Sequence, residues 1–273
     1  MIRRIGGNLT LRKGDAPEAS AQLERDGYAV LRGVLEPELV AQLADEIAKV
    51  FETYGAERGR SDRSEFRYEM LNRAPTCQAA VGHPGILAAI EPLLGEDCHV
   101  IANTAWWNPA NFGGGPWHCD AGPHVPRPEG VAWDDRIPYP VFAIGAHLYL
   151  RDCPLECGPT AVIPGSHRSG RLPPFDRASD EKLEYEGRAA VALEARAGDV
   201  ALFVSDAWHR GLPAKAGGVG RLFLQAHYAR RDLAQRIRTT ADVNHLSPEA
   251  TARIKSARER SLLGLHSPFF YDG

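Results

Sequence analysis

His118 and Asp120 lie two residues apart in the segment WHCD, and together they could bind one metal ion. If this segment is extended, residues i and i+2 point to the same side of the backbone, while Cys119 faces away. An imidazole and a carboxylate are common ligands of divalent first-row metals. With ten His and 16 Asp in 273 residues, about 0.6 His-x-Asp pairs are expected by chance, so the pair needs a third ligand to be convincing.

The segment AGDVALFVSDAWHRG supplies that third candidate, His209. A Gly-Asp turn and an apolar strand precede the histidine, which stands just beyond the end of the strand. The alternative interpretation is a loop histidine that caps a turn. Two histidines and one carboxylate on one face of an ion, with the other positions open, form the facial triad of non-haem iron(II) oxygenases.

Arg221 opens the apolar strand RLFLQAHYA twelve residues after His209. The Gly-rich turn AGGVG between them sends the chain out and back, so we expect the arginine near the metal end of the fold. A guanidinium offers a fixed bidentate fork for a carboxylate, which a lysine does less well. The sequence therefore predicts a carboxylate-binding position close to the metal site.

Three other histidines have structural interpretations. His167 follows Pro-Gly-Ser, where a histidine usually ties down its own loop by hydrogen bonds. Alternation along its strand puts His227 on the face of Arg221, as a hydrogen-bonded core histidine. His147 shares a strand face with Tyr149, and both core packing and a place in the pocket remain open for it.

Short strands between residues 98 and 230 must position these side chains. Apolar runs alternate there with turn residues: CHVIANTAWW, VFAIGAHLYL, TAVIPG, AAVALEA, DVALFV and RLFLQAHYA. Several short strands with Gly, Pro, Asn and Asp between them predict a sandwich or barrel rather than a βαβ sheet.

Helices flank this β region on both sides. Asp15 with Pro17 starts a short helix that Gly27 ends, and a strand is expected at residues 28 to 31. Apolar side chains at helical spacing predict three more helices, at residues 36 to 54 behind Pro37, 84 to 94, and 248 to 262. We expect a single domain over residues 1 to 273, with a β core at about 98 to 230 and helical buttresses at 15 to 95 and 232 to 265.

Composition limits the partners of this chain. A hydrophobic fraction of 44% and a charged fraction of 25% are ordinary for a globular protein. Lys plus Arg total 32 against 35 Asp plus Glu, so no polybasic excess attracts nucleic acid or an anionic membrane. We therefore expect a small-molecule substrate, with no nucleic-acid or membrane partner.

Cysteine usage and the apolar segments indicate the compartment. The five cysteines are an odd number without CxxC spacing, which argues against a disulfide framework and a zinc ribbon. The N-terminus MIRRIGGNLTLRKGD has no apolar stretch of signal-peptide length, and no apolar run approaches the roughly 18 residues of a membrane span. We expect a reducing, cytoplasmic location.

Three segments together resemble the phytanoyl-CoA dioxygenase family of 2-oxoglutarate-dependent oxygenases. They are PWHCDAGPH, RDCPLECGPTAVIPGSHRSG, and AGDVALFVSDAWHRG followed by Arg221, in the family's order and roughly its spacing. The combination is far more specific than any one piece. The resemblance implies a mainly β (α+β) fold with a double-stranded β-helix, or jelly-roll, core and flanking N- and C-terminal helices.

The same resemblance implies roles for six residues. Those expected to bind iron(II) are His118, Asp120 and His209, and those expected to contact 2-oxoglutarate are Arg221, at its distal carboxylate, with Thr160 and Asn103 as lesser contacts. One position departs from the family pattern, because Gly211 stands where members often carry a hydroxyl residue that assists the arginine. The arginine would then need a partner from elsewhere.

The implied activity is a dioxygenase that uses Fe(II), 2-oxoglutarate and O2 to hydroxylate, or otherwise oxidise at a C–H bond, a small organic metabolite. Asp120 argues against halogenation, because related halogenases carry a small residue there and bind chloride in its place. Two alternatives stay open. A cupin-like metalloprotein without 2-oxoglutarate would leave Arg221 unexplained, and a non-catalytic jelly-roll binding protein would usually have lost a ligand.

Residues 121 to 141, which we call the connecting loop, follow Asp120 directly and are longer than most strand connections. Loops of this kind are commonly functional lids. The charged and aromatic side chains that could meet a substrate are His124, Arg127, Trp133, Asp134, Asp135 and Arg136.

Overall fold

The protein is built around a six-stranded antiparallel sheet. The computed structural model describes residues 3–5, 8–10, 18–55, 64–120, 122–233 and 246–266. The strand order is β3-β9-β6-β11-β5-β4. The strands are β3 (Tyr28–Leu31), β4 (Glu65–Tyr68), β5 (His99–Asn108), β6 (Ala143–Tyr149), β9 (Val200–Val204) and β11 (Arg221–Ala229). A separate antiparallel pair, β1 (Arg3–Ile5) and β2 (Asn8–Thr10), lies at the N-terminus.

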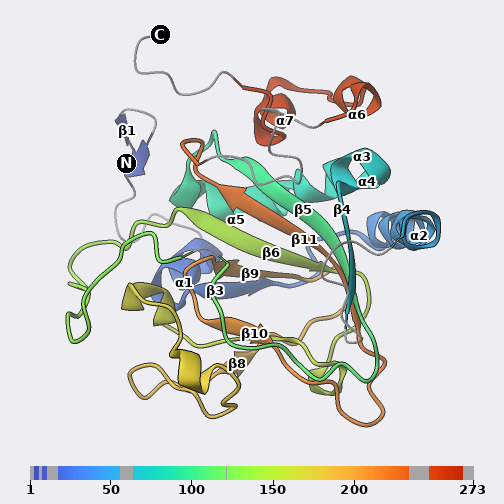
Figure 1. The fold of residues 1–273 in the computed structure, drawn as a ribbon. Coiled ribbons are helices and arrows are strands. Elements are labelled where there is room, and N and C mark those ends of the chain that lie inside the picture. The colour runs from blue at the N-terminus through green and yellow to red at the C-terminus, as the bar shows by residue number, and fades with distance from the viewer. Residues whose placement is uncertain are drawn as a thin grey trace.

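A smaller sheet of order β10-β7-β8 faces the large one across an apolar layer (Figure 1). Its strands are β7 (Thr160–Val162), β8 (Val191–Ala192) and β10 (His209–Gly211). Val162 packs with Phe203 and Phe223 of the large sheet, whereas Ala161 belongs to a cluster with Trp117 and Trp208. Alternation along β7 therefore points Val162 into the space between the sheets and Ala161 outward.

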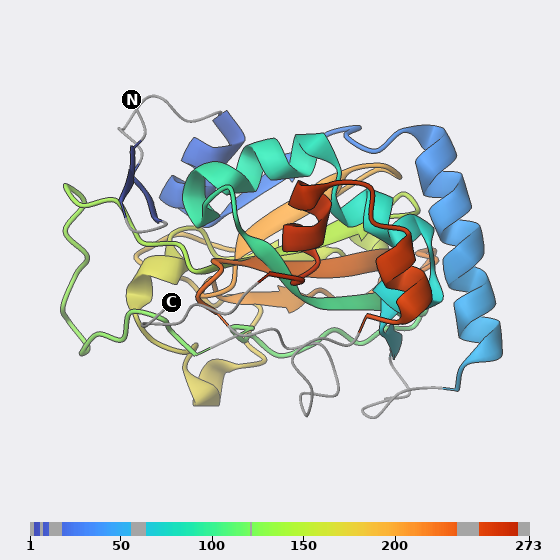
Figure 2. The same cartoon turned by 90° about the horizontal axis from the view of Figure 1, so that it is seen from above.

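Helices cover the other face of the large sheet (Figures 1 and 2). They are α1 (Glu18–Asp26), α2 (Pro37–Thr53), α3 (Met70–Arg73), α4 (Thr76–Val81), α5 (Pro84–Leu94), α6 (Pro248–Ala252) and α7 (Ala257–Leu262). The chain also forms the 3₁₀ turns η1 (Leu155–Cys157), η2 (Ser166–Ser169) and η3 (Phe175–Arg177). Leu43, Ile90, Leu224 and Leu262 belong to one apolar cluster, so helices from both ends of the chain pack on the same sheet.

The predicted fold class is confirmed. Two antiparallel sheets face each other, and helices from both ends of the chain lie on one of them, as expected for a jelly-roll core with flanking helices. Among the described residues, no helix is both long and apolar enough to cross a lipid bilayer.

Most predicted elements are found close to their expected bounds. The strand at 28 to 31 and the helix at 84 to 94 match β3 and α5, and the helix at 36 to 54 matches α2 to within a residue at each end. Helix α1 ends before Gly27, whose φ of 82° is available to glycine at little cost. The predicted start of this helix, at Asp15 and Pro17, lies outside the described residues.

The prediction of a single helix at residues 248 to 262 is wrong. The chain forms two short helices there, α6 and α7. Ser256 has an extended backbone and its side chain accepts a hydrogen bond from the Glu259 N–H at 3.0 Å, while the Glu259 carboxylate accepts one from the Lys255 N–H at 2.7 Å. These bonds start a new helix, which the apolar spacing alone did not reveal.

Candidate metal centre

The three predicted ligands meet in the space between the two sheets. His118, Asp120 and His209 each offer one ligand atom, and these atoms all lie within 4.8 Å of one another. The His209 Nε2 atom is 3.4 Å from Asp120 Oδ1, and the His118 Nε2 atom is 3.9 Å from the same oxygen. His209 is buried, whereas the His118 side chain is 48% exposed, so solvent reaches the cluster from the side of His118.

Backbone pairing brings the two histidines together. The His118 N–H donates to His209 O, and the His209 N–H donates to His118 O, each at 3.0 Å. The two residues thus form an isolated antiparallel bridge at His209, the first residue of β10, directly after the turn that follows β9. The Asp120 N–H donates to Ser205 O at 3.1 Å, which keeps the segment extended and puts its side chain on the same side as His118.

Both imidazoles are oriented by backbone carbonyls. The His118 Nδ1 atom lies 2.9 Å from Pro116 O, and the His209 Nδ1 atom lies 2.9 Å from Ala207 O. A carbonyl can only accept, so each Nδ1 carries the proton and each Nε2 keeps its lone pair. This is the arrangement in which an outer hydrogen bond prepares a histidine to bind a metal through its other nitrogen.

His227 orients the carboxylate. Its Nε2–H donates to Asp120 Oδ2 at 2.7 Å, which leaves Oδ1 directed toward the two histidines. The prediction that His227 is a hydrogen-bonded histidine on the face of Arg221 is confirmed. The alternation along β11 predicted that His227 lies on the inner face. It did not predict that its hydrogen-bond partner is Asp120, the candidate metal ligand.

The charges at this cluster suit a divalent cation. Burial alone would raise the pKa of Asp120, but the neighbouring His209 and His227 outweigh burial and hold that pKa well below its usual range. Burial, with help from His209, lowers the pKa of His118. Burial also opposes protonation of His209, yet Asp120 prevails and raises its pKa. The site thus combines an ionised carboxylate with a neutral His118, and metal binding would compete with protonation of His209.

Arg221 lies at the far end of the same inner space. It is buried, its Nη1 donates to Thr160 Oγ1 at 2.7 Å, and its Nε donates to Asn108 Oδ1 at 3.2 Å. Its guanidinium lies 5.0 Å from the centre of the Phe223 ring and 5.7 Å from that of Phe112. Within the described ranges, no carboxylate forms an ion pair with Arg221.

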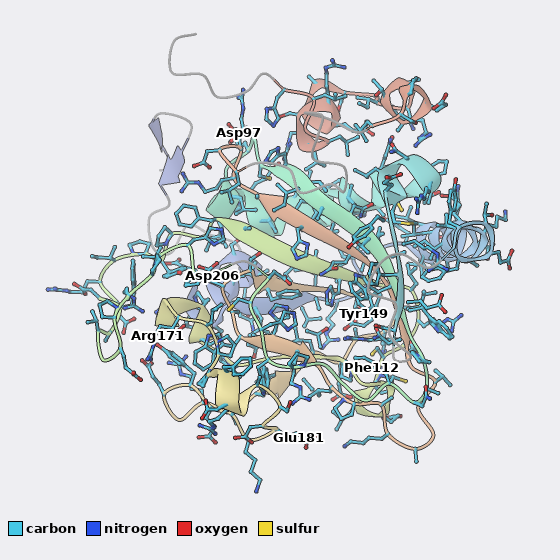
Figure 3. All side chains as sticks on the ribbon, in the orientation of Figure 1. Asp97, Phe112, Tyr149, Arg171, Glu181 and Asp206 are labelled. Atoms are coloured by element: carbon cyan, nitrogen blue, oxygen red, sulfur yellow. The ribbon has the colours of Figure 1, made fainter. Side chains whose placement is uncertain are left out.

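A relay of hydrogen bonds leads from Arg221 to His147. The Thr160 hydroxyl accepts from Arg221 and lies 3.0 Å from His147 Nδ1. Burial, followed by the charge of Arg221, holds the pKa of His147 well below its usual range, so His147 is neutral and can accept the Thr160 proton. The Tyr149 hydroxyl is fully buried near Thr160 and makes no well-formed hydrogen bond among the described residues. Figure 3 shows Tyr149 and Phe112 at one end of this space and Asp206 at the other.

The structure does not bring Asn103 to Arg221. Asn103 pairs with Ala226 on β11, whereas Asn108 pairs with Arg221. The two asparagines are an odd number of residues apart on β5, so their side chains point to opposite faces of the sheet. Asn103 instead donates to Gln225 O at 3.0 Å. Asn108, which directly follows the run CHVIANTAWW, is the asparagine of β5 that contacts Arg221.

Asp206 holds both ends of the connecting loop. Its buried carboxylate accepts from the His124 N–H at 2.9 Å and from the Tyr139 hydroxyl at 3.0 Å. The His124 Nδ1 atom lies 2.5 Å from its other oxygen. His124 is therefore committed to this contact, and the expectation that it meets a substrate is not supported.

The turn that carries Asp206 also touches the metal cluster. The carbonyl before it, Ser205 O, accepts from the Asp120 N–H, and the carbonyl after it, Ala207 O, accepts from His209 Nδ1. Three consecutive residues of one turn thus connect the connecting loop with two of the three predicted ligands. In the sequence, SDAW indicates only a turn before His209, so this role of Asp206 was not predicted.

A comparison with protein families matches phytanoyl-CoA dioxygenase (PhyH) over residues 23–221. The chain belongs to the phytanoyl-CoA dioxygenase family. The match begins in α1 and ends at Arg221, the first residue of β11, so it includes the smaller sheet, the other five strands of the large sheet and all three predicted metal ligands. The comparison with curated proteins found no match.

Solved structures share the fold of this phytanoyl-CoA dioxygenase family member. The non-heme alpha-ketoglutarate-dependent epimerase SnoN from nogalamycin biosynthesis is 22% identical, with a TM-score of 0.61 over 84% of this chain and 88% of SnoN. The carbocyclase SnoK from the same biosynthesis is 20% identical, with a TM-score of 0.62 over 83% of this chain and 88% of SnoK. EctD from S. alaskensis, solved with 2-oxoglutarate and 5-hydroxyectoine, is 21% identical, with a TM-score of 0.62 over 81% of this chain and 79% of EctD.

Proposed function

We propose that this protein is a non-haem Fe(II)- and 2-oxoglutarate-dependent dioxygenase that hydroxylates a C–H bond of a small organic metabolite. The observation that carries the proposal is that a two-histidine, one-carboxylate cluster faces the same inner space as a buried arginine, which pairs with no carboxylate of the described residues. Family membership supports the class. We also propose that residues 1 to 273 form one domain, because helices from both ends share one apolar cluster.

The donor set fits iron(II). His118 Nε2, His209 Nε2 and Asp120 Oδ1 would bind it, and each is already freed for that role by an outer hydrogen bond. Two nitrogens and one carboxylate oxygen on one side leave the opposite positions open. Iron(II) there, with 2-oxoglutarate and O2, would supply the oxidising chemistry and release succinate and CO2.

The residues around Arg221 fit the distal carboxylate of 2-oxoglutarate. The guanidinium would bind it bidentately, while Thr160 and Asn108 keep the fork in place through their contacts at 2.7 and 3.2 Å. The buried hydroxyl of Tyr149, which makes no well-formed hydrogen bond among the described residues, would donate to the same carboxylate, and this would relieve the cost of its burial.

Asp120 supports oxidation at a C–H bond rather than halogenation. Its Oδ1 is directed at both histidines, so a carboxylate occupies the position that a halide would need. Solved structures with this fold include an epimerase and a carbocyclase. Hydroxylation is the outcome we propose for this chain because it needs no feature beyond the triad and the co-substrate arginine.

Two experiments test the proposal. Anaerobic titration should show stoichiometric Fe(II) binding and 2-oxoglutarate binding to the iron-loaded protein. Arg221→Ala should weaken 2-oxoglutarate binding by roughly 1.5–3 kcal/mol, about one to two decades in affinity. Unchanged 2-oxoglutarate affinity in this variant would instead favour a cupin-like metalloprotein.

The second experiment seeks the substrate. Metabolites are screened for stimulated succinate formation under O2 with added Fe(II), and Asp120→Ala serves as the inactive control. For a hydroxylation under ¹⁸O2, mass spectrometry should find one labelled oxygen in succinate and one in the product. Turnover without succinate, or a chlorinated product in the presence of chloride, would exclude the proposed reaction.

A further inference from the structure

The guanidinium of Arg127, in the connecting loop, is buried without a hydrogen-bond partner. Its Nε, Nη1 and Nη2 atoms are all shielded from solvent, and none has a partner among the described residues. The side chain is held by the Trp133 ring, whose centre lies 5.4 Å from the Arg127 Cζ atom. Its backbone N–H donates to Gly170 O at 3.1 Å. A permanently charged group in such a place is strongly unfavourable unless an anion pairs with it.

The connecting loop has no carboxylate left for this cation. Each of its three carboxylates pairs with another arginine: Glu129 with Arg171 at 2.8 Å, Asp134 with Arg136 at 2.7 Å, and Asp135 with Arg168 at 2.8 Å. The buried Asp206 is also committed, to His124 and Tyr139. None of these four carboxylates is therefore free to pair with Arg127, whose three guanidinium nitrogens have no hydrogen-bond partner in the described part of the chain.

The surroundings of Arg127 resemble a binding position more than a packing defect. Trp133 lies against the guanidinium and in turn packs edge-on against Tyr139, with ring centres 5.1 Å apart. Burial raises the pKa of Tyr139 and of Tyr185, and the positive charge of Arg127 opposes that rise in both, which places the guanidinium near both phenols. A charged fork within aromatic walls can select a carboxylate or phosphate and exclude water from it.

We propose that Arg127 binds an anionic group, a carboxylate or phosphate, of the substrate. This inference rests on the proposed function, since it assigns the substrate of the same site. Hydrogen bonds connect this part of the loop with the metal cluster. The Tyr139 hydroxyl donates to Asp206, and the carbonyl of the preceding residue, Ser205, accepts from the Asp120 N–H. Because the guanidinium is shielded, the anion enters when the connecting loop opens and is enclosed when it closes.

The first test uses inorganic phosphate and acetate as probes on the full-length, metal-free protein at constant ionic strength. Calorimetry and thermal unfolding should show that both anions bind and stabilise the parent. Arg127→Met keeps the length of the side chain but removes the charge, so anion affinity should fall about ten- to hundredfold. Without anion, this variant should be at least as stable as the parent, because an unpaired buried charge is gone.

Arg136→Met is the matched control. It removes an arginine from the same loop, but the Arg136 side chain is 89% exposed and, within the described ranges, forms an ion pair only with Asp134. It should bind both anions like the parent. Parent-like anion affinity in Arg127→Met, or no binding of either anion to the parent, overturns the assignment.

The second test separates a substrate group from a free anion. Once the succinate screen identifies an acidic substrate, its neutral amide is compared with it. Arg127→Met should raise KM for the acid about ten- to hundredfold and leave KM for the amide unchanged. Equal KM values for the acid in parent and variant overturn the assignment to the substrate. The phosphate titration needs neither Fe(II) nor 2-oxoglutarate, so its failure would not contradict the proposed function. Conversely, a protein that binds phosphate but not Fe(II) would contradict the proposed function and not the role of Arg127.

Discussion

Gly211 leaves the space that the Arg221 guanidinium occupies. A Cβ atom at position 211 would lie 2.5 Å from Arg221 Nη2, closer than real Cβ contacts, and a tight 3.0 Å from the Phe112 ring. Across the ladder, Gly211 pairs with Thr160, whose hydroxyl accepts from Arg221 Nη1. The hydroxyl that resembling proteins often carry at the position of Gly211 is thus supplied here by its cross-strand neighbour.

This relationship predicts the effect of two substitutions on 2-oxoglutarate affinity. Gly211→Ser should displace the guanidinium and weaken binding about tenfold or more, because a bidentate contact depends on its geometry. Thr160→Val keeps the shape but removes one hydrogen bond to a charged group, and should weaken binding by about 1.5 kcal/mol, roughly tenfold. Gly55→Ala is the control, since a Cβ there meets no atom within 4 Å. Stronger binding in Gly211→Ser would mean that the serine assists the arginine rather than displacing it.

Iron(II) affinity should depend on the three ligands and, to a smaller degree, on His227. Single alanine substitutions of His118, Asp120 or His209 should abolish stoichiometric binding in anaerobic titrations. His227→Leu leaves all three ligands but removes the hydrogen bond to Asp120 Oδ2, and should lower affinity about 10- to 100-fold. Parent-like affinity in His227→Leu would show that the carboxylate is held by other contacts.

Local patterns in the sequence predicted most strands of the two facing sheets, though not β4 or β10, and they singled out the three candidate metal ligands that the structure brings together. Alternation predicted that His118 and Asp120 share a side, and that Arg221 and His227 share a face. Residues joined across long separations were not accessible in this way. The pairing of Asn108 with Arg221 depends on the register of β5 against β11, and the contact of Asp206 with His124 joins residues 82 positions apart. Both follow from tertiary packing, which no local pattern contains.

Loss of the Asp206 carboxylate should make the connecting loop more mobile. Its middle part is exposed, with Val131 at 52% and Ile137 at 54%, so limited proteolysis of the free protein should cut there first. Asp206→Ala removes the acceptor of His124 and Tyr139, and should make cleavage several-fold faster. Asp176→Ala, at an exposed carboxylate of η3, is the control. Equal cleavage rates in parent and Asp206→Ala would show that the loop is held elsewhere, and equal rates with and without ligands would argue against a mobile lid.

His167 should make the protein less stable in acid. Its side chain is fully buried, its Nε2–H donates to Glu24 O at 3.0 Å, and burial lowers its pKa to about 4 from the ordinary 6.5. As pH falls below 6.5, His167 becomes protonated in the unfolded chain but stays neutral in the folded chain. Its contribution to the free energy of unfolding is therefore full above pH 6.5 and is lost as pH falls toward 4. Between pH 7 and 4.5 this one group should remove roughly 2 to 3 kcal/mol from the free energy of unfolding. His167→Gln keeps a donor for Glu24 O but cannot titrate, so urea unfolding should show a flatter dependence on pH than in the parent. Parallel curves for the two proteins would mean that His167 is protonated equally in both states, and would contradict its burial as a neutral group.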